Sequence, residues 1–427
     1  MVFVTSRNAP SAKPVGIDNG GFQVKVGVSL EEARSMIKDR CHLLPVEDVS
    51  ILEAAGRVCA PDICADSDLP AGPQSAVDGY AVGDSGCHDS GVYTLKESFV
   101  LGDHPLVSLE PGEAYGVATG GDLPPGTAAV FPKERTTIKD GQLVAREMFK
   151  AGNNIKAAGE DFKAGERLLG RGTRLTPGAV SLLAAFGHSR VQVYRRPRVA
   201  LASISRNIVP WYMQPGLGQT RDCNIPLLTA MVSQNGGIVT ASRIFSEEEP
   251  PAADRYAGLL AEADVLIIIG GTFAATGYEA PLLMESSGAE VLYWDVPVQP
   301  GSHTGAAVLG SKLWFALSGN PAACAVGFQL FAVPALRAVQ GLSPEPVYVK
   351  ACCPEGFPKK TGSRRFIRAK AEWQDSWKVT VLPGQKPSMI RSLVDCNALI
   401  DMPAGSPGIE AGQVVDALLL SPYCDIP

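Results

Sequence analysis

Two short glycine-containing turns follow apolar runs of the chain and could bind an anion. Gly270, Gly271 and Thr272 come directly after Val265–Ile269, and Ser318, Gly319 and Asn320 come directly after Lys312–Leu317. Glycine lets the backbone approach a ligand closely, and amides at the start of a helix bind phosphates and carboxylates. Either turn alone is explained as a tight connection between a strand and a helix. Together, at one sheet edge, the two turns favour an anion or phosphate site.

A third loop, residues 218–224, adds an acidic side chain to this region. Asp222 or Asn224 could cap the helix predicted to follow. The carboxylate of Asp222 could equally bind a ligand, and composition alone does not favour either role.

Asp78 and Thr119 are two further candidates, each next to a glycine in a short loop. Asp-Gly is a frequent turn pair, so a turn role is the simpler explanation of Asp78 from composition alone. Thr119, which precedes Gly120 and Gly121, has the same ambiguity.

Signatures of several other sites are missing from the sequence. The five histidines form no HExxH pattern, and there is no GxSxG, Walker lysine or GxGxxG loop. None of the ten cysteines forms a CxxC pair, so we expect neither a zinc site nor a disulfide framework. A net charge of −6 argues against a nucleic-acid partner held by a general basic field.

The 427 residues suffice for two to four domains, and a 45% hydrophobic content supplies several cores. The first 25 residues lack the apolar core of a signal peptide. Apolar runs such as Val265–Ile269 are far shorter than a membrane span. We therefore expect a cytoplasmic protein that has no membrane partner.

Strands and helices alternate between residues 198 and 340, which predicts a parallel sheet with helices on both faces. The predicted strands are residues 199–203, 265–269 and 312–317, and the predicted helices are residues 225–234, 256–263 and 322–340. This sheet would place the candidate anion turns at the carboxyl ends of its strands.

Other helices are predicted at residues 29–38, where Ser29 and Glu32 have the spacing of a capping box, and at residues 49–56. A further helix should begin at Pro177, be capped by Thr176 and stop at Gly187. Residues 80–150 are rich in Val, Thr, Gly and Pro and predict a β-rich insertion. The last 85 or so residues predict a small β-barrel or sandwich.

Many motifs, in order from about residue 29 to residue 420, resemble those of the molybdopterin molybdenumtransferase family, to which the gephyrin E domain also belongs. Residues 75–81 resemble the family's SAMDGYA signature, residues 222–224 its DSN, and residues 318–321 its PGNP. The other motifs that carry the resemblance are residues 120–130, 152–165, 195–200, 270–271 and 392–400.

The resemblance implies an α/β multidomain fold in four parts. These are a central parallel-sheet molybdopterin-binding domain (191–342), a β-rich insertion domain (66–150), an N-terminal linking domain (26–65 with 151–190) and a C-terminal small β-barrel (343–427). It also implies a head-to-tail homodimer, in which the central domain of one subunit faces the insertion and C-terminal domains of the other.

An activity in molybdenum cofactor biosynthesis also follows from the resemblance. Family members insert molybdenum, delivered as molybdate, into adenylylated molybdopterin and release AMP with the help of Mg²⁺. The resemblance makes Asp78, Thr119 and Asp222 catalytic, with Asp78 and Asp222 holding the magnesium. The residues that would bind the small-molecule pterin ligand are Gly270, Gly271, Thr272, Ser318, Gly319 and Asn320.

The chain departs from the family's motifs in three places. Residues 203–208 lack both acids of STGDEL and carry Arg206 and Asn207 instead, residues 273–278 lack a further acid, and Gln299 and Ser302 replace two lysines. Because magnesium is held by hard carboxylate oxygens, fewer acids weaken the expected metal site. Glu279 or Asp295 could take the vacant places.

Two other functions therefore compete with the enzyme. One is a catalytically eroded paralogue that binds a pterin or nucleotide-like ligand, or regulates a partner, without turnover. The other is a scaffold for protein interactions.

Overall fold

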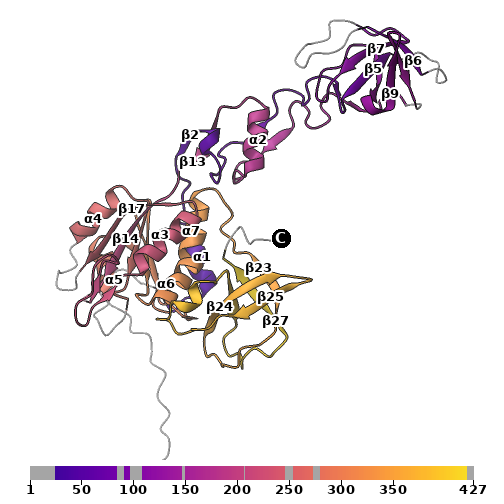
Figure 1. Ribbon diagram of the computed structural model, residues 1–427. Helices are drawn as coiled ribbons and strands as arrows, with labels where there is room; N and C mark the ends of the chain where they lie inside the picture. Colours follow the sequence, from indigo (N-terminus) through magenta and orange to yellow (C-terminus); the bar gives the residue numbers. More distant parts are fainter. Residues whose placement is uncertain are drawn as a thin grey trace, which may run out of the picture. The chain divides into compact units, whose positions relative to one another are not determined.

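The computed structural model describes residues 25–83, 91–96, 108–146, 150–205, 207–245, 253–272 and 279–420 (Figure 1). The chain forms two compact units. Unit 1 comprises the chain up to Asp48, Gly56–Ala60 and the chain from Gln192 onward, and unit 2 comprises Val49–Ala55 and Pro61–Val191.

A seven-stranded sheet forms the centre of unit 1, in the order β1-β19-β21-β22-β18-β14-β17. The neighbours β17, β14, β18 and β22 are parallel, whereas β21 is antiparallel to both of its neighbours. The predicted parallel arrangement is thus confirmed for the four strands that lead to the candidate anion turns. The strands are β1 (Lys25–Val26), β14 (Arg198–Ile204), β17 (Ile238–Phe245), β18 (Val265–Ile269), β19 (Glu290–Trp294), β21 (Gly305–Leu309) and β22 (Lys312–Leu317).

Helices cover both faces of this sheet because its central strands are apolar on both sides. In β18 the side chains of Val265, Ile267 and Ile269 join one core cluster, and those of Leu266 and Ile268 join the other. The first cluster contains residues of α1 (Leu30–Lys38), α3 (Asn224–Gln234), α6 (Pro321–Gly327) and α7 (Val333–Val339). The second contains residues of α4 (Ala253–Ala261) and α5 (Glu279–Ser286).

The predicted capping box of α1 is present. The Ser29 hydroxyl accepts a hydrogen bond from the Glu32 amide at 3.1 Å, and the Glu32 carboxylate accepts one from the Ser29 amide at 2.9 Å. Together the two bonds satisfy two backbone donors that a helix start otherwise leaves unpaired.

The predicted helix 322–340 contains a π-helical segment, η4 (Phe328–Ala332), between α6 and α7. Pro334 has no amide hydrogen to donate to the carbonyl of Leu330, and the Nε of Arg34 on α1 donates to that carbonyl at 2.9 Å.

Pro321–Val339 is long and apolar enough to cross a membrane, but 72% of its most apolar stretch is buried inside the protein. It is therefore a core helix of unit 1.

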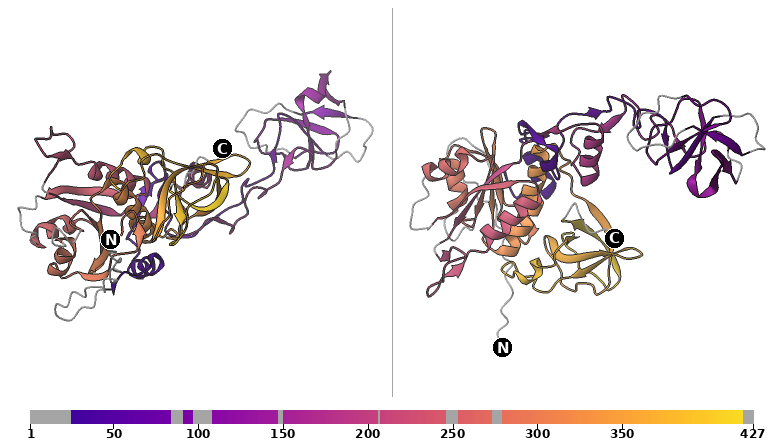
Figure 2. Two further views of the ribbon diagram at one scale, coloured as in Figure 1. Left: turned by 90° about the horizontal axis from the view of Figure 1, so that it is seen from below. Right: turned by 45° about the horizontal axis from the view of Figure 1, so that its top comes forward.

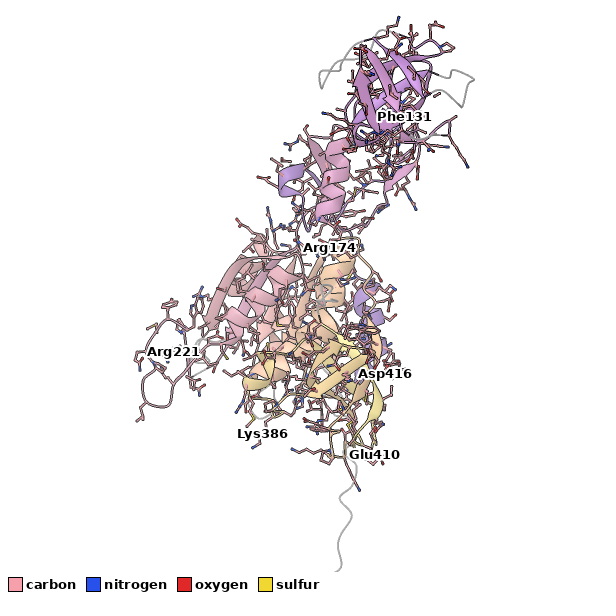
Figure 3. The ribbon with its side chains drawn as sticks, turned by 45° about the vertical axis from the view of Figure 1, so that its right-hand side comes forward. Phe131, Arg174, Arg221, Lys386, Glu410 and Asp416 are labelled. Carbon is pink, nitrogen blue, oxygen red and sulfur yellow. The ribbon has the colours of Figure 1, made fainter. Side chains whose placement is uncertain are left out.

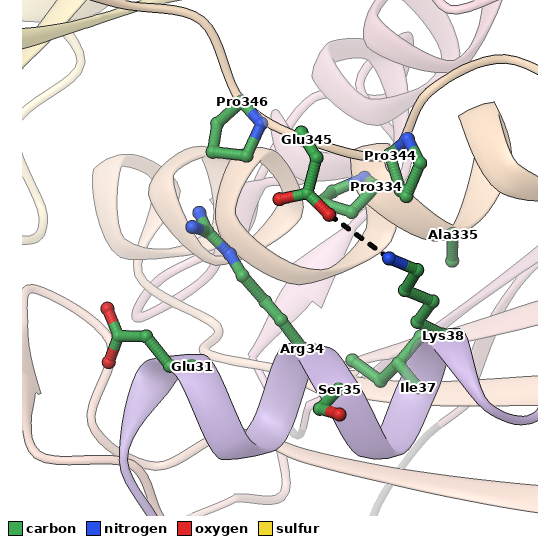
Figure 4. Close-up of a pocket in the computed structure, with 10 residues that line it drawn as sticks. All are labelled: Glu31, Arg34, Ser35, Ile37, Lys38, Pro334, Ala335, Pro344, Glu345 and Pro346. Atoms are coloured by element: carbon green, nitrogen blue, oxygen red, sulfur yellow. Dashed lines mark hydrogen bonds and ion pairs between the residues drawn. The ribbon is translucent and has the colours of Figure 1, made fainter.

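Arg34 also lines a cavity of about 270 Å³ between α1 and residues 334–346 (Figure 4). In this cavity Lys38 forms an ion pair with Glu345 at 3.2 Å, and both side chains are largely exposed. None of the residues predicted for the anion site lines the cavity.

The last part of unit 1 is a closed five-stranded β-barrel, as predicted (Figure 2). Its strands pair in the order β24-β25-β23-β27-β26, and β26 pairs with β24 to close it. The short strand β20 (Val298–Gln299) joins its edge at β24. The barrel elements are β23 (Tyr348–Cys353), β24 (Arg364–Trp373), β25 (Trp377–Val381), η5 (Arg391–Leu393), β26 (Ala398–Met402) and β27 (Gln413–Leu419).

Unit 2 contains the predicted β-rich insertion as a six-stranded sheet in the order β8-β5-β7-β6-β10-β9. The predicted helix at Pro177 is α2 (Pro177–Ala185), and the Thr176 hydroxyl caps it by accepting from the Ala179 amide at 3.2 Å. The other elements of unit 2 are η1 (Ile51–Glu53), β3 (Ile63–Cys64), β4 (Gln74–Ser75), β5 (Gly79–Gly83), β6 (Val92–Leu95), β7 (Glu113–Val117), β8 (Thr127–Pro132), η2 (Lys133–Arg135), β9 (Thr136–Lys139), β10 (Gln142–Ala145), β11 (Ile155–Lys156) and β12 (Arg167–Leu169).

The prediction of a helix at residues 49–56 is wrong. Its first residues belong to strand β2 (Val46–Ser50), which pairs with β13 (Arg190–Tyr194), and only the three residues of η1 are helical. The amide of Ile51 donates to the carbonyl of Ser189 at 3.1 Å, so a partner distant in sequence replaces the local helical bond.

We expect Arg34→Met to lower the free energy of unfolding of unit 1 by about 1–2 kcal/mol, because the Leu330 carbonyl then loses its donor inside the protein. The matched change Lys38→Met, one turn away, removes an exposed ion pair and should cost less than about 0.5 kcal/mol. All five tryptophans lie in unit 1, so urea unfolding followed by their fluorescence reports this unit alone. Equal losses in the two variants would contradict this role of Arg34.

Candidate functional site

The turn after β18 can be built only from glycine. Gly270 and Gly271 have φ angles of 86° and 63°, a region that side-chain-bearing residues rarely adopt. A Cβ atom on Gly270 would lie 2.6 Å from the carbonyl oxygen of Ile204, at the end of β14. The Gly270 amide donates to the Leu317 carbonyl at 2.9 Å, which joins the ends of β18 and β22. Thr272, which completes the turn, is buried.

The turn after β22 lies directly against the first one. A Cβ atom on Gly319 would lie 3.4 Å from the Cα of Gly270. The Ser318 hydroxyl accepts from the Asn320 amide at 3.3 Å and closes the turn. The structure therefore brings the two predicted glycine turns together at one sheet edge.

Asn320 takes the capping position before α6, but its side chain makes no capping hydrogen bond. Pro321, the first residue of the helix, has no amide hydrogen, and the Ala322 amide donates to the Pro387 carbonyl at 3.0 Å. Of the donors at this helix start, that of Pro321 is absent and that of Ala322 is already used.

Asp222 caps α3 with one oxygen of its carboxylate, and the other oxygen takes no part in the cap. Its Oδ1 accepts hydrogen bonds from the amides of Asn224 at 2.7 Å and Ile225 at 3.1 Å. The side chain is 1% exposed, and its Oδ2 is buried without a hydrogen-bond partner. Because a buried carboxylate oxygen without a partner is costly, this atom is a strong candidate to meet a ligand. Oδ1 therefore has the capping role, and the ligand role of Oδ2 stays a prediction.

Asn224 connects this carboxylate to the glycine turns. Its Nδ2 donates to the Gly319 carbonyl at 2.7 Å, and its Oδ1 is buried without a partner. Asp222 also lies close to α6, because its charge adds to the effect of burial in raising the pKa of the Cys324 thiol. All three predicted loops of unit 1 therefore meet around two unpartnered oxygen atoms.

Asp78 and Thr119 form a second group, within unit 2. The amide and the hydroxyl of Thr119 each donate to Oδ1 of Asp78 at 2.8 Å. These two bonds lower the pKa of the exposed Asp78 carboxyl. Gly79 is the first residue of β5 rather than a turn residue, and a Cβ on it would overlap the carbonyl of Phe131 on β8. Asp78 is thus placed by strand packing and kept ionised by Thr119.

The positions where the chain departs from the family's motifs are only partly described. Arg206 and residues 273–278 lie outside the described residues, as does the side chain of Glu279. The Asn207 side chain accepts a hydrogen bond from the Ser205 hydroxyl at 2.9 Å. Oδ1 of Asp295 lies 3.0 Å from the Nδ1 of His303, so this acid already has a partner.

Arg368, on β24, is a site candidate that sequence reasoning missed. Its guanidinium is 1% exposed, and Nε donates to the Ser392 hydroxyl at 2.7 Å. Nη2 donates to the Gly384 carbonyl at 3.1 Å, and Nη1 is buried without a partner. Burial lowers the pKa of this group. The sequence feature that could have pointed to Arg368 is Ser392, which belongs to a motif that resembles one of the family.

Arg368 also lines a cavity of about 340 Å³ between the barrel and helices α3 and α6. The loop that holds its Nη2 continues to Pro387, whose carbonyl binds the Ala322 amide at the start of α6. A buried cation with an unpartnered N–H therefore lies close to the helix that follows the second glycine turn.

Three family models match the chain: the MoeA N-terminal region (domain I and II) at residues 28–187, a probable molybdopterin binding domain at residues 200–338, and the MoeA C-terminal region (domain IV) at residues 350–420. A molybdopterin molybdenumtransferase of Bacillus subtilis is 31% identical over 413 residues, which cover 93% of this chain and 95% of that protein. The enzyme of the same name from Staphylococcus epidermidis is 29% identical over 400 residues, with coverage of 92% and 95%.

The fold is similar to solved structures of the same kind. A molybdopterin biosynthesis MoeA protein from Pyrococcus horikoshii superimposes with a TM-score of 0.79 at 26% identity, over 92% of this chain and 100% of that chain. A second structure of the protein from that organism gives a TM-score of 0.78 at 25% identity, over 93% and 100%.

We expect Thr119→Val to raise the pKa of Asp78 toward its usual range, because one of the two hydrogen bonds to the charged form is lost. Thr119→Ser keeps the hydroxyl and should leave the pKa as it is in the wild type. Carboxyl titration followed by NMR measures both. An unchanged pKa in the valine variant would show that the amide bond alone sets the ionisation of Asp78.

Proposed function

Because the chain belongs to the molybdopterin molybdenumtransferase family, we propose that it inserts molybdenum, delivered as molybdate, into adenylylated molybdopterin and releases AMP. This reaction is a step of molybdenum cofactor biosynthesis, and we place it in the cytoplasm. The observation that carries the proposal is the unpartnered Oδ2 of Asp222 beside the two glycine turns. At this place the carboxylate of Asp222, which could bind a ligand, lies beside backbone that a ligand can approach closely.

The anionic end of the pterin ligand binds, in this proposal, at Gly270, Gly271 and Gly319. Backbone amides in such turns attract phosphate and molybdate without a large change in the protein. The buried Nη1 of Arg368 supports an anionic ligand as well, since a desolvated guanidinium gains most from an oxyanion partner. The reaction needs the dithiolene, the phosphate and the molybdate to be held in one orientation.

Magnesium fits the oxygens that the structure leaves unpartnered. Oδ2 of Asp222 and Oδ1 of Asn224 are hard oxygen ligands, and magnesium prefers such atoms while it retains several waters. The described residues contain no group of three or more His, Cys, Asp or Glu side chains that could hold a metal. Water and substrate oxygens therefore complete the shell, and Asp78 is the second carboxylate of the proposed site. When bound, the ion neutralises negative charge on the phosphate and molybdate.

In this proposal Asp222 has two tasks. Oδ1 holds the start of α3 through the amides of Asn224 and Ile225, which fixes the direction of Oδ2. Because the first task is satisfied inside the protein, Oδ1 holds the carboxylate in one direction, and the buried Oδ2 has no competing partner.

We expect Asp222→Asn to retain the fold and lose function. The amide oxygen can still accept the two capping bonds, but an NH₂ group replaces the charged Oδ2. Magnesium affinity and the rate of molybdenum insertion in vitro should each fall by roughly tenfold or more. Asp416→Asn, which alters an exposed carboxylate paired with Lys350, is the matched control and should leave both unchanged. Wild-type rates in folded Asp222→Asn would remove this carboxylate from the site.

We also propose that the chain acts as a homodimer in which Asp78 and Thr119 of one subunit complete the unit 1 site of the other. Each group is incomplete alone: unit 2 provides a carboxylate and a hydroxyl, and unit 1 provides the glycine turns and Asp222.

Sedimentation at micromolar concentration should give twice the monomer mass of 44.9 kDa. Mixing inactive Asp78→Asn with inactive Asp222→Asn should then restore activity through heterodimers that carry one intact site. A monomer, or no complementation in a mixed dimer, would contradict the shared site.

A further inference from the structure

Residues 210–219 carry an unusual amount of exposed apolar surface. The exposed fractions of their side chains are 47% for Trp211, 74% for Tyr212, 48% for Met213 and 107% for Leu217. Four large exposed apolar side chains within seven residues are unusual on a soluble protein, and exposed apolar surface of this kind marks binding sites. We call residues 210–219 the aromatic loop.

The aromatic loop is held in shape by its own hydrogen bonds. Its two ends form the parallel pair β15 (Ile208–Val209) and β16 (Thr220–Arg221). The Arg221 guanidinium donates from Nε to the Met213 carbonyl at 3.0 Å and from Nη2 to Oε1 of Gln214 at 2.7 Å. The rings of Trp211 and Tyr212 lie edge to face, with centroids 5.3 Å apart. Figure 3, in which Arg221 is labelled, shows this segment projecting from the body of unit 1.

The base of the aromatic loop adjoins the candidate site. The Asp222 amide donates to the Val209 carbonyl at 2.8 Å, so the residue with the unpartnered carboxylate oxygen also anchors the loop. Trp211 follows Val209 by two residues, and the Met213 carbonyl is bound by Arg221, the neighbour of Asp222. Trp211, Tyr212 and Met213 lie in the half of the loop that follows β15, and Leu217 lies in the half that precedes β16.

We propose that Trp211 and Tyr212, whose rings are perpendicular, form a platform in which one ring offers its face to a planar heteroaromatic ring of the ligand and the other supports it edge-on, while the anionic end of the ligand is held at the glycine turns. This inference rests on the function proposed above and adds to it the residues that recognise the ring. The ligand contains two such rings, a pterin and an adenine, and both have flat faces that stack on indole and phenol side chains. Aromatic side chains recognise rings through these faces without needing a particular hydrogen-bond pattern.

Charge supports a ring that carries an anionic group. Arg221 adds a guanidinium at the base of the loop, and the described residues show it bonded only to neutral oxygens, those of Met213 and Gln214. A positive group beside two aromatic rings suits a nucleotide or a pterin phosphate better than a neutral apolar partner. A second copy of the chain is the other possible occupant, and the test below separates the two.

Isothermal titration of the full-length protein with AMP and, separately, with molybdopterin tests the platform. Trp211→Ala and Tyr212→Ala should each weaken the binding of at least one compound by roughly tenfold, the loss expected for one stacked ring. Trp211→Phe keeps a flat ring and should retain most of the affinity. Leu217→Ala removes the most exposed apolar side chain of the same loop and should have no effect. A loss confined to AMP assigns the platform to adenine, and a loss confined to molybdopterin assigns it to the pterin.

Two results would overturn the inference. If wild-type protein binds the compounds and Trp211→Ala binds them equally well, the platform is excluded while the proposed function stands. If Trp211→Ala instead dissociates a dimer in sedimentation at unchanged affinity, the aromatic loop is a contact between subunits. Failure of the wild type to bind either compound would overturn the proposed function together with this inference.

Discussion

The close approach of three strand ends at Gly270 determines the geometry of the whole ligand edge of the sheet. Its amide binds the Leu317 carbonyl, its Cα is in contact range of Gly319, and a side chain on it would strike the Ile204 carbonyl. Strands β14, β18 and β22 can therefore end side by side only if this residue is glycine. Asn224, bound to the Gly319 carbonyl, then places the start of α3 and its capping aspartate at the same edge.

In the proposed site a single acidic residue combines a structural and a chemical role. A helix start needs an acceptor for its first amides, and a magnesium or oxyanion site needs a charged oxygen held in a fixed direction. Oδ1 of Asp222 meets the first need, and its unpartnered Oδ2 is the oxygen that we propose for the second. Thr119 acts on Asp78 in a comparable way, since its two hydrogen bonds favour the charged form of that carboxylate.

Local signals in the sequence predict much of this fold. The apolar runs of β18 and β22, the capping box at Ser29 and the Thr176–Pro177 start of α2 all depend on residues close together in the chain. The two glycine turns are predictable for the same reason, because each follows a buried strand. Their meeting at one edge follows from the rule that parallel strands end together.

Features that depend on distant partners could not be predicted in this way. Residues 49–56 are predicted to form a helix, yet the pairing of β2 with β13 and the bond from Ile51 to Ser189 leave only η1 helical. Arg34 donates to the Leu330 carbonyl of the π-helical segment from 296 residues earlier in the chain, a contact that no local pattern reveals. The setting of Arg368 arises from carbonyls and a hydroxyl 16 to 24 residues away, and no spacing in the sequence reveals it.

Unit 1 is interrupted in the sequence by unit 2, and this order matters during synthesis. Helix α1 leaves the ribosome first, but its partner Leu330 lies 296 residues later. At about 5–20 residues per second, that separation corresponds to roughly 15 to 60 seconds of translation. Unit 2 can fold within this interval, whereas Leu30, Ala33 and Ile37 remain without the core that buries them. The apolar face of α1 therefore stays exposed to chaperones and proteases until the second half of unit 1 has been made.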